Sequence, residues 1–270
     1  MARGLRSACT IGWLWGLVGL SPGTEGVSFG ENGLPDHDLQ QITAEVNRTY
    51  ARVTSARGRI ERTVKVADGV ADTLRGRFAV EKPDRLLVDL VGENRQVVGY
   101  DGETFRVYFP DQDRGIYRKV VDLTSLERLV TGPTPFFGNM LALIEDGFSL
   151  AVADTAAGNV IVKAVPERPL LFNFVLMAID PRTWTIGAVE HFDRNNQLVS
   201  QTRFHEYQVT EDTLFFPTLV ETATVSDRGI VDETTRLSRV ELNVALQGED
   251  LSMPDSPETV WSLMPLEGPH

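Results

Sequence analysis

The residues that could perform acid–base or metal chemistry are few and widely spaced in this chain of 270 residues. Its four histidines, His37, His191, His205 and His270, lack the short spacings of metal ligands, and there is no G-x-S-x-G motif or glycine-rich phosphate loop. His205 and Glu206 come nearest to a catalytic pair, but adjacent residues of a strand face opposite sides. We therefore predict that the protein is not an enzyme and uses no metal or other cofactor.

The elements around these residues begin with four short segments in which apolar residues alternate with polar ones. Such a two-residue period is typical of half-buried strands, and it is seen in residues 74–80, 85–91, 97–100 and 104–109. Asp101-Gly102 is a strong hairpin signal, and Pro110 ends the last strand because proline has no amide donor. This part of the chain is predicted to be an antiparallel meander with one apolar face.

The same alternation precedes and follows this meander. A first strand over residues 56–65 is expected to form a hairpin with the segment that begins at Leu74. After Phe148, turns rich in Asn, Asp, Pro and Gly separate further candidate strands: 149–153, 159–166, 173–179, 185–192, 199–209, 219–225 and 235–246. One large antiparallel sheet is consistent with this spacing and with the chain's length.

Two segments have helical spacing instead. Near the N-terminus, the positions Leu39, Ile42, Val46, Tyr50 and Val53 predict an amphipathic helix from about residue 36 to residue 53, with Pro35 at its start. Between the two groups of strands, residues 121–147 carry apolar residues at helical spacing, interrupted by glycine and prolines. This second segment is predicted to form two short helices joined by a stiff linker.

The order of these motifs resembles the periplasmic lipoprotein carriers, the LolA-like or lipoprotein-sorting family. The resemblance covers most of residues 36–225, and the motifs that carry it are Gly76-x-Phe78-x-Val80-x-Lys82-Pro83, Val97-Val98-x-x-Asp101-Gly102, Phe105-x-x-Tyr108-x-Pro110 and Thr134-Pro135-Phe136 with Leu141. It implies a mainly antiparallel β fold: a curved, incomplete barrel with an N-terminal amphipathic helix and a short helical lid.

The resemblance also implies a lipid-binding site. The wall of an apolar cavity would be formed by Phe78, Val80, Leu86, Val88, Phe105 and Val107, and its lid by Phe136, Phe137, Met140 and Leu141. Carriers of this family commonly have an arginine, implicated in ligand transfer, where this chain has Lys82. Lysine lacks the planar donors of a guanidinium. The alternatives are an ordinary core closed by a helix and, for Lys82, a solvated cation at a strand end.

By the same resemblance, the expected function is that of a periplasmic carrier that binds the acyl chains of lipoproteins or another lipid. An inner-membrane donor and an outer-membrane acceptor would be its partners, and the protein would be a monomer. Two alternatives remain open: a lipid- or lipoprotein-sensing envelope regulator of the same fold, and a secreted, non-enzymatic interaction module. Nucleic acid is not expected as a partner, because the net charge is −12 and no basic segment interleaved with aromatic residues is present.

The N-terminus predicts export. Arg3 and Arg6 precede an apolar run from Cys9 to Leu20, which is too short to span a bilayer and matches a secretory signal peptide, with an uncleaved anchor as the alternative. Arg6 stands where a lipidation motif requires an apolar residue, so Cys9 is not expected to be lipidated. The expected division is a signal peptide at 1–26, a lipid-binding domain at 27–246 and a loosely ordered, acidic, proline-containing tail at 247–270.

Overall fold

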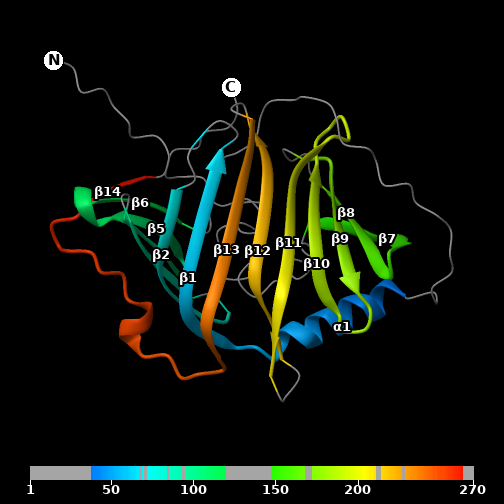
Figure 1. Ribbon diagram of the computed structural model, residues 1–270, viewed down its shortest axis with the longest axis horizontal. Helices are drawn as coiled ribbons and strands as arrows, with labels where there is room; N and C mark the ends of the chain where they lie inside the picture. The colour runs from blue at the N-terminus through cyan, green and yellow to red at the C-terminus, as the bar shows by residue number, and fades with distance from the viewer. Residues whose placement is uncertain are drawn as a thin grey trace.

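The computed structural model describes residues 38–66, 69, 72–83, 85–92, 95–119, 147–167, 172–210, 214–226 and 229–263. Within these ranges, fourteen strands form one sheet in the order β14-β6-β5-β4-β3-β2-β1-β13-β12-β11-β10-β9-β8-β7 (Figure 1). The expected signal peptide and the expected lid helices lie outside the described residues.

Nearly every neighbouring pair of strands is antiparallel and follows chain order, as expected for a meander; the pair β14–β6 is parallel. The strands are β1 (Ser55–Val66), β2 (Asp72–Glu81), β3 (Arg85–Val91), β4 (Gln96–Asp101), β5 (Thr104–Phe109), β6 (Arg114–Lys119), β7 (Phe148–Ala156), β8 (Asn159–Pro166), β9 (Phe174–Asp180), β10 (Thr185–Phe192), β11 (Leu198–Val209), β12 (Phe215–Ser226), β13 (Gly229–Leu242) and β14 (Val260–Leu263). A 3-10 turn, η1 (Pro110–Gln112), joins β5 to β6.

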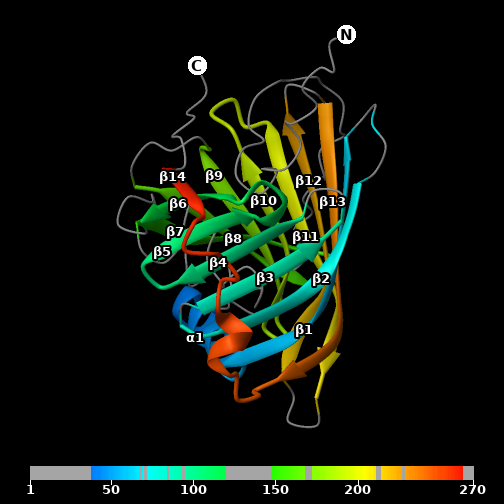
Figure 2. The same ribbon diagram turned by 90° about the vertical axis from the view of Figure 1, so that its left-hand side faces the viewer.

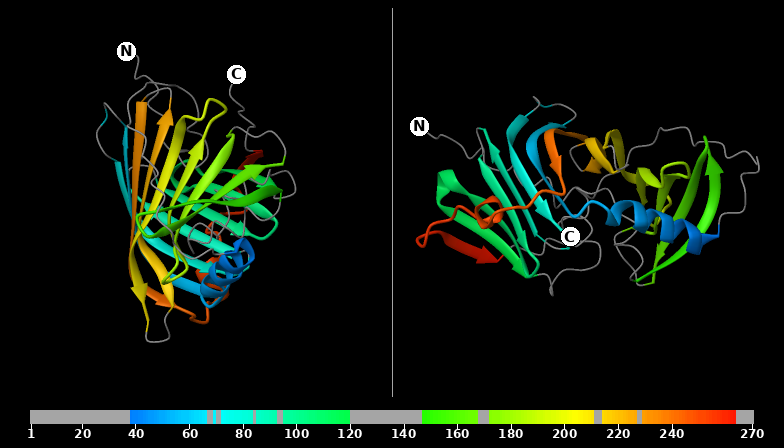
Figure 3. Two further views of the ribbon diagram at one scale, coloured as in Figure 1. Left: turned by 90° about the vertical axis from the view of Figure 1, so that its right-hand side faces the viewer. Right: turned by 90° about the horizontal axis from the view of Figure 1, so that it is seen from below.

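The sheet is strongly curved, so that β1–β6 and β7–β10 form two halves that face each other across an inner space (Figures 2 and 3). Among the described strands, β14 and β7 are its two edges and do not pair with each other. The predicted fold class, a curved and incompletely closed antiparallel barrel, is therefore confirmed.

Helix α1 (Leu39–Ala51) packs on the inner side of the β7–β10 half. It begins later than the sequence pattern suggested, because the side chain of Asp38 accepts a hydrogen bond from the amide of Gln40 and caps the first turn. Its buried residues Ile42, Val46 and Tyr50 join a cluster with side chains of β7–β10 such as Val162. One half of the inner face is thus filled by the protein's own helix.

A tyrosine pair fixes the position of α1 on the sheet. The hydroxyl of Tyr50 accepts a hydrogen bond from the amide of Ile186 at 2.9 Å, while the hydroxyl of Tyr207 donates to the carbonyl of Ile186 at 2.7 Å. The two hydroxyl oxygens are 3.4 Å apart. Burial raises the pKa of Tyr50 to about 12, so its hydroxyl stays protonated and can act as donor and acceptor.

We predict that Tyr50→Phe lowers the free energy of unfolding by about 1–3 kcal/mol, because it leaves the buried amide of Ile186 without its acceptor. Urea denaturation of both proteins measures this difference. Thr49→Ala, which removes only a 3.4 Å hydrogen bond to the carbonyl of Thr183, is the control and should cost less. Equal stability of Tyr50→Phe and the unmodified protein would contradict the prediction.

The C-terminal segment differs from the expected loosely ordered tail over its described part, residues 247–263. A 3-10 turn, η3 (Gly248–Leu251), leads to β14, and Leu251, Met253 and Trp261 pack on the outer face against Leu87, Val97 and Tyr108. Glycine makes this close packing possible: a Cβ atom at Gly115 would lie 2.4 Å from the Trp261 ring. The acidic and proline-rich composition suggested a loosely ordered tail, but a few apolar side chains hold the segment against the sheet.

Truncation of Trp261 to alanine should therefore release the end of the chain. We expect a loss of about 1–2 kcal/mol in the free energy of unfolding, less than for a fully buried tryptophan because Trp261 is half-buried. Protease cleavage after residue 243 should become faster. Val260→Ala, at a strongly exposed position of the same strand, should change neither quantity, and an unaltered cleavage pattern for Trp261→Ala would contradict this role.

Candidate functional site

The predicted wall residues lie together on the inner face of β2–β5. Strand register places Phe78 opposite Val88, Val80 opposite Leu86, and Val107 opposite Val98, so their side chains form continuous rows across the sheet. Phe78, Val80, Leu86 and Val88 belong to one buried cluster, and Phe105 and Val107 to a second that shares Val98 and Tyr100 as neighbours. The expected lid residues Phe136, Phe137, Met140 and Leu141 lie outside the described residues.

These wall clusters are separate from the cluster that α1 fills. The ring of Phe78 stacks on Phe216 of β12, with ring centroids 6.4 Å apart. Val53, which follows α1, and Leu237 of β13 complete the first wall cluster. The inner face therefore has two apolar halves: one on β7–β10 occupied by α1, and one on β1–β6 that carries the predicted wall.

A polar stripe crosses β1, β13, β12 and β11, the strands that stand between β2 and β10 in the sheet. Arg62 and Glu233 form a two-pronged ion pair, with nitrogen–oxygen distances of 2.7 and 2.9 Å, and the Arg62 side chain is only 3% exposed. Beside them, Thr202 and Thr222 share a hydrogen bond of 3.1 Å, and Thr222 stands opposite Glu233. A buried charge requires such a partner, because an unpaired one would cost several kcal/mol.

Sequence reasoning missed this stripe, although a signal was present. Arg62 lies between Ile60 and Val64 in the two-residue period, so it shares the buried face with them. A cation on an apolar face needs an anion nearby, and Glu233 is placed suitably only by the pairing of β1 with β13, which are 171 residues apart at this contact.

Lys82 follows β2 directly and is half-buried. Its ammonium group donates a hydrogen bond to the carbonyl of Tyr50 in the last turn of α1. A cation at this end of a helix is favourable, because the final carbonyl groups are partly negative and lack partners within the helix. Lys82 thus connects the end of β2 to the end of α1, and a role in ligand transfer remains a prediction.

Burial lowers the pKa of Lys82 from 10.5 to about 8, because it disfavours the charged form. Between these two pH values the unfolded chain binds the proton more tightly than the folded chain. The contribution of Lys82 to stability should therefore increase as the pH rises from about 8 towards 10.5, and decrease again as the pH falls.

This sign can be tested with Lys82→Met, which keeps the apolar stem and cannot titrate. The free energy of unfolding of the unmodified protein, minus that of the variant, should increase between pH 7.5 and pH 10. Urea denaturation at a series of pH values measures the difference. A difference that does not vary with pH would show that the pKa of Lys82 is not lowered in the folded protein.

The two histidines that the structure describes have different neighbours. Nε2 of His205 is 3.1 Å from Glu221, whereas Glu206 pairs with Arg236 at 2.8 Å, so the two adjacent residues have different partners. His191 of β10 lies edge-on to the Phe172 ring at 5.3 Å, and burial lowers its pKa to about 4. No three His, Cys, Asp or Glu residues in the described ranges are grouped so that they could hold a metal ion.

The fold places this protein in a recognisable structural class. Its open, curved sheet is similar to that of a domain described as outer membrane lipoprotein-sorting from Vibrio parahaemolyticus, with a TM-score of 0.57 and 12% identity, covering 77% of this chain and 95% of that one. A LolA superfamily protein from Nitrosomonas europaea matches with a TM-score of 0.55 and 12% identity, covering 79% of this chain and 97% of its own. At such identities the likeness concerns the fold, which is that of the LolA-like proteins.

A sequence relative agrees with this class. The chain is 32% identical over 138 residues to the "Outer-membrane lipoprotein carrier protein" of Alkalilimnicola ehrlichii. The matched region is 51% of this chain and 61% of that relative, so the chain spans somewhat less than two thirds of its length. No family model matches the chain. The resemblance to LolA-like lipoprotein carriers is confirmed. Among the described residues, no helix has the length and apolar character needed to cross a membrane.

Proposed function

We propose that the inner face of β2–β5 binds the acyl chains of lipoproteins or of another lipid, and that the protein carries them through the periplasm. The observation that carries this proposal is the continuous row of apolar side chains on that face, which belong to clusters other than the one that α1 fills. The similarity to an outer-membrane lipoprotein carrier supports it.

The mechanism is non-covalent. Each methylene removed from water contributes about 0.8 kcal/mol, so a few acyl chains supply ample affinity without any polar contact. Release then requires a competitor for the same apolar surface. We assign that role to the segment containing Phe136, Phe137, Met140 and Leu141, which would cover the wall when lipid is absent and move aside when it binds.

The direction of transport follows from affinity. A carrier of this kind receives lipid from an inner-membrane donor and loses it to an outer-membrane acceptor that binds it more tightly, with no hydrolysis by the carrier itself. Lys82 joins the end of β2 to the end of α1, so a change at this residue would alter how the wall and the helix meet. We propose that this is how Lys82 affects transfer.

We expect the whole chain to retain acyl-bearing lipid when it is exported and purified from a bacterium with an outer membrane. Native mass spectrometry and solvent extraction detect this lipid. Phe136→Glu should reduce the bound lipid about tenfold, because a carboxylate in an apolar site must be desolvated. Ile230→Glu, at a position of β13 that is 52% exposed, is the matched control and should retain lipid.

Circular dichroism must show that both variants are folded. A lipid-free chain that also fails to bind a fluorescent fatty acid would contradict the carrier function and favour an interaction module with a filled core. Turnover of ester substrates by the chain would instead indicate a hydrolase.

A further inference from the structure

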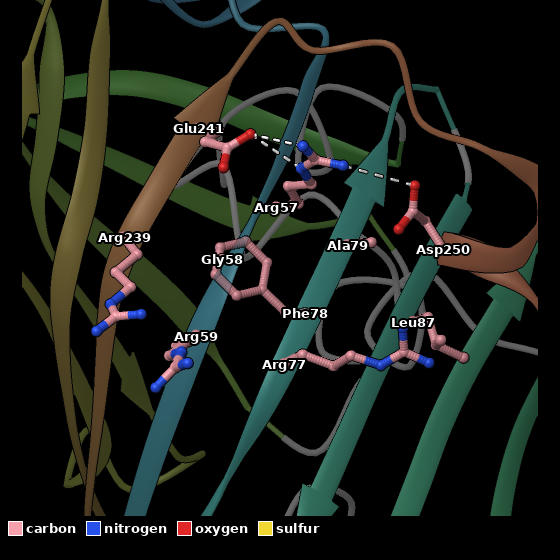
Figure 4. Close-up of a pocket in the computed structure, with 10 residues that line it drawn as sticks. All are labelled: Arg57, Gly58, Arg59, Arg77, Phe78, Ala79, Leu87, Arg239, Glu241 and Asp250. Carbon is pink, nitrogen blue, oxygen red and sulfur yellow. Dashed lines mark hydrogen bonds and ion pairs between the residues drawn. The ribbon is translucent and has the colours of Figure 1, made fainter.

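A cluster of arginines gathers on the outer face of the sheet, opposite the lipid wall. Arg57, Arg59, Arg77 and Arg239 come from β1, β2 and β13 and line a hollow of about 220 Å³ (Figure 4). This is unexpected in a chain whose net charge is −12. The hollow is smaller than the roughly 300–1,000 Å³ of drug-sized ligand sites, so it fits a small group.

The cluster includes a like-charged pair that strand pairing alone would disfavour. Arg59 stands directly opposite Arg77 in the antiparallel pair β1–β2. Like charges at such positions repel each other and destabilise a sheet. Arg77 lies 3.7 Å from Asp89, which also contacts Arg95 at 3.5 Å. Within the described residues, Arg59 forms no ion pair.

A β-bulge adds a third guanidinium to this pair. Between Arg57 and Arg59 of β1, the partner strand moves from Glu241 to Ser238, so β13 contains one extra residue. Arg239 adopts a φ of 52° there, a left-handed conformation that is costly for a residue with a side chain. The extra residue changes the alternation of sides in β13 and brings Arg239 to the same side as Arg59, as Figure 4 shows.

The two acidic residues that line the hollow, Glu241 and Asp250, lie at one end of it, where they contact Arg57. Glu241 accepts two hydrogen bonds from Arg57, at 2.8 and 3.0 Å, and Asp250 lies 3.9 Å from Arg57 (top of Figure 4). Arg59, Arg77 and Arg239 are exposed. Gly58, between Arg57 and Arg59, has no side chain because a Cβ atom there would lie 2.9 Å from the Phe78 ring and from the carbonyl oxygen of Ser238.

We propose that this hollow binds a phosphate or similar oxyanion, with Arg59 and Arg239 as its donors. Planar guanidinium groups donate paired hydrogen bonds to such oxygens, and the bound anion would remove the repulsion within the cluster. The anion is either free in solution or the headgroup of an anionic phospholipid. This site is independent of the acyl-chain site on the inner face.

Two variants of the whole chain test the proposal. Arg239→Gly removes one donor and also relieves the left-handed backbone, so its thermal stability should be equal to or higher than that of the unmodified protein. Arg59→Gln removes the second donor at an exposed position. Arg182→Gln is the matched control, because Arg182 is an arginine at 85% exposure in the distant β9–β10 turn.

Binding is measured with two probes: inorganic phosphate, by calorimetry and amide NMR shifts, and vesicles of phosphatidylglycerol compared with phosphatidylcholine, by sedimentation. The unmodified chain should bind at least one probe, more weakly at higher salt, and both test variants should bind it at least tenfold more weakly than the control. Binding of phosphate identifies a soluble oxyanion, and binding of phosphatidylglycerol vesicles alone identifies a headgroup. Absence of binding to both probes, or binding that the two test variants leave unchanged, would overturn the proposal.

Discussion

The structure depends on a geometrical constraint: a sheet that curves without closing has an inner apolar face larger than one helix can cover. Helix α1 covers the β7–β10 half, where Ile42, Val46 and Tyr50 enter the core. The other half presents Phe78, Val80, Leu86 and Val88 on the same inner side. These four side chains are at most 3% exposed, since apolar area of this extent is unfavourable in water unless something covers it. In the proposed mechanism, the lid segment and a lipid would replace each other as its cover.

A polar stripe interrupts the apolar inner face on the central strands. Arg62 and Glu233 are removed from water, and their attraction must offset that desolvation. This ion pair favours one register: a slip of one residue between β1 and β13 would turn the inward side chains of one of the two strands to the outer face and separate Arg62 from Glu233. The same strands carry the bulge at Arg239, so the pairing of β1 with β13 determines both the inner wall and the outer arginine cluster.

Much of the sheet could be predicted from alternation alone. The bounds expected for 85–91, 104–109, 159–166 and 185–192 are those of β3, β5, β8 and β10. Strand β6 was not predicted, because its residues do not alternate in polarity. Gly115 lies beneath Trp261 on one face, and Arg118 is buried on the other face. Strand β13 begins six residues earlier than expected, at Gly229 instead of Thr235, because Glu233 occupies an inner position where the pattern requires an apolar residue.

The wall of the site could also be predicted from the sequence, because it depends on alternation within single strands. The wall residues follow a local period, and the structure brings them together as expected. Lys82 was recognisable only as a cation before a proline, since its partner, the Tyr50 carbonyl, lies 32 residues away. The arginine cluster could not be found at all, because Arg59 and Arg239 are 180 positions apart and meet only through a bulge that no local pattern reveals.

The central claim is that acyl chains occupy the β1–β6 half of the inner face and not the half filled by α1. Methyl NMR of the whole chain with a spin-labelled fatty acid tests this most directly, because the label broadens the signals of nearby methyl groups. The account predicts selective broadening at Val80, Leu86, Val88 and Val107, with Val162, Val175 and Val189 unaffected. Broadening confined to the second group, or none at saturating fatty acid, would contradict it.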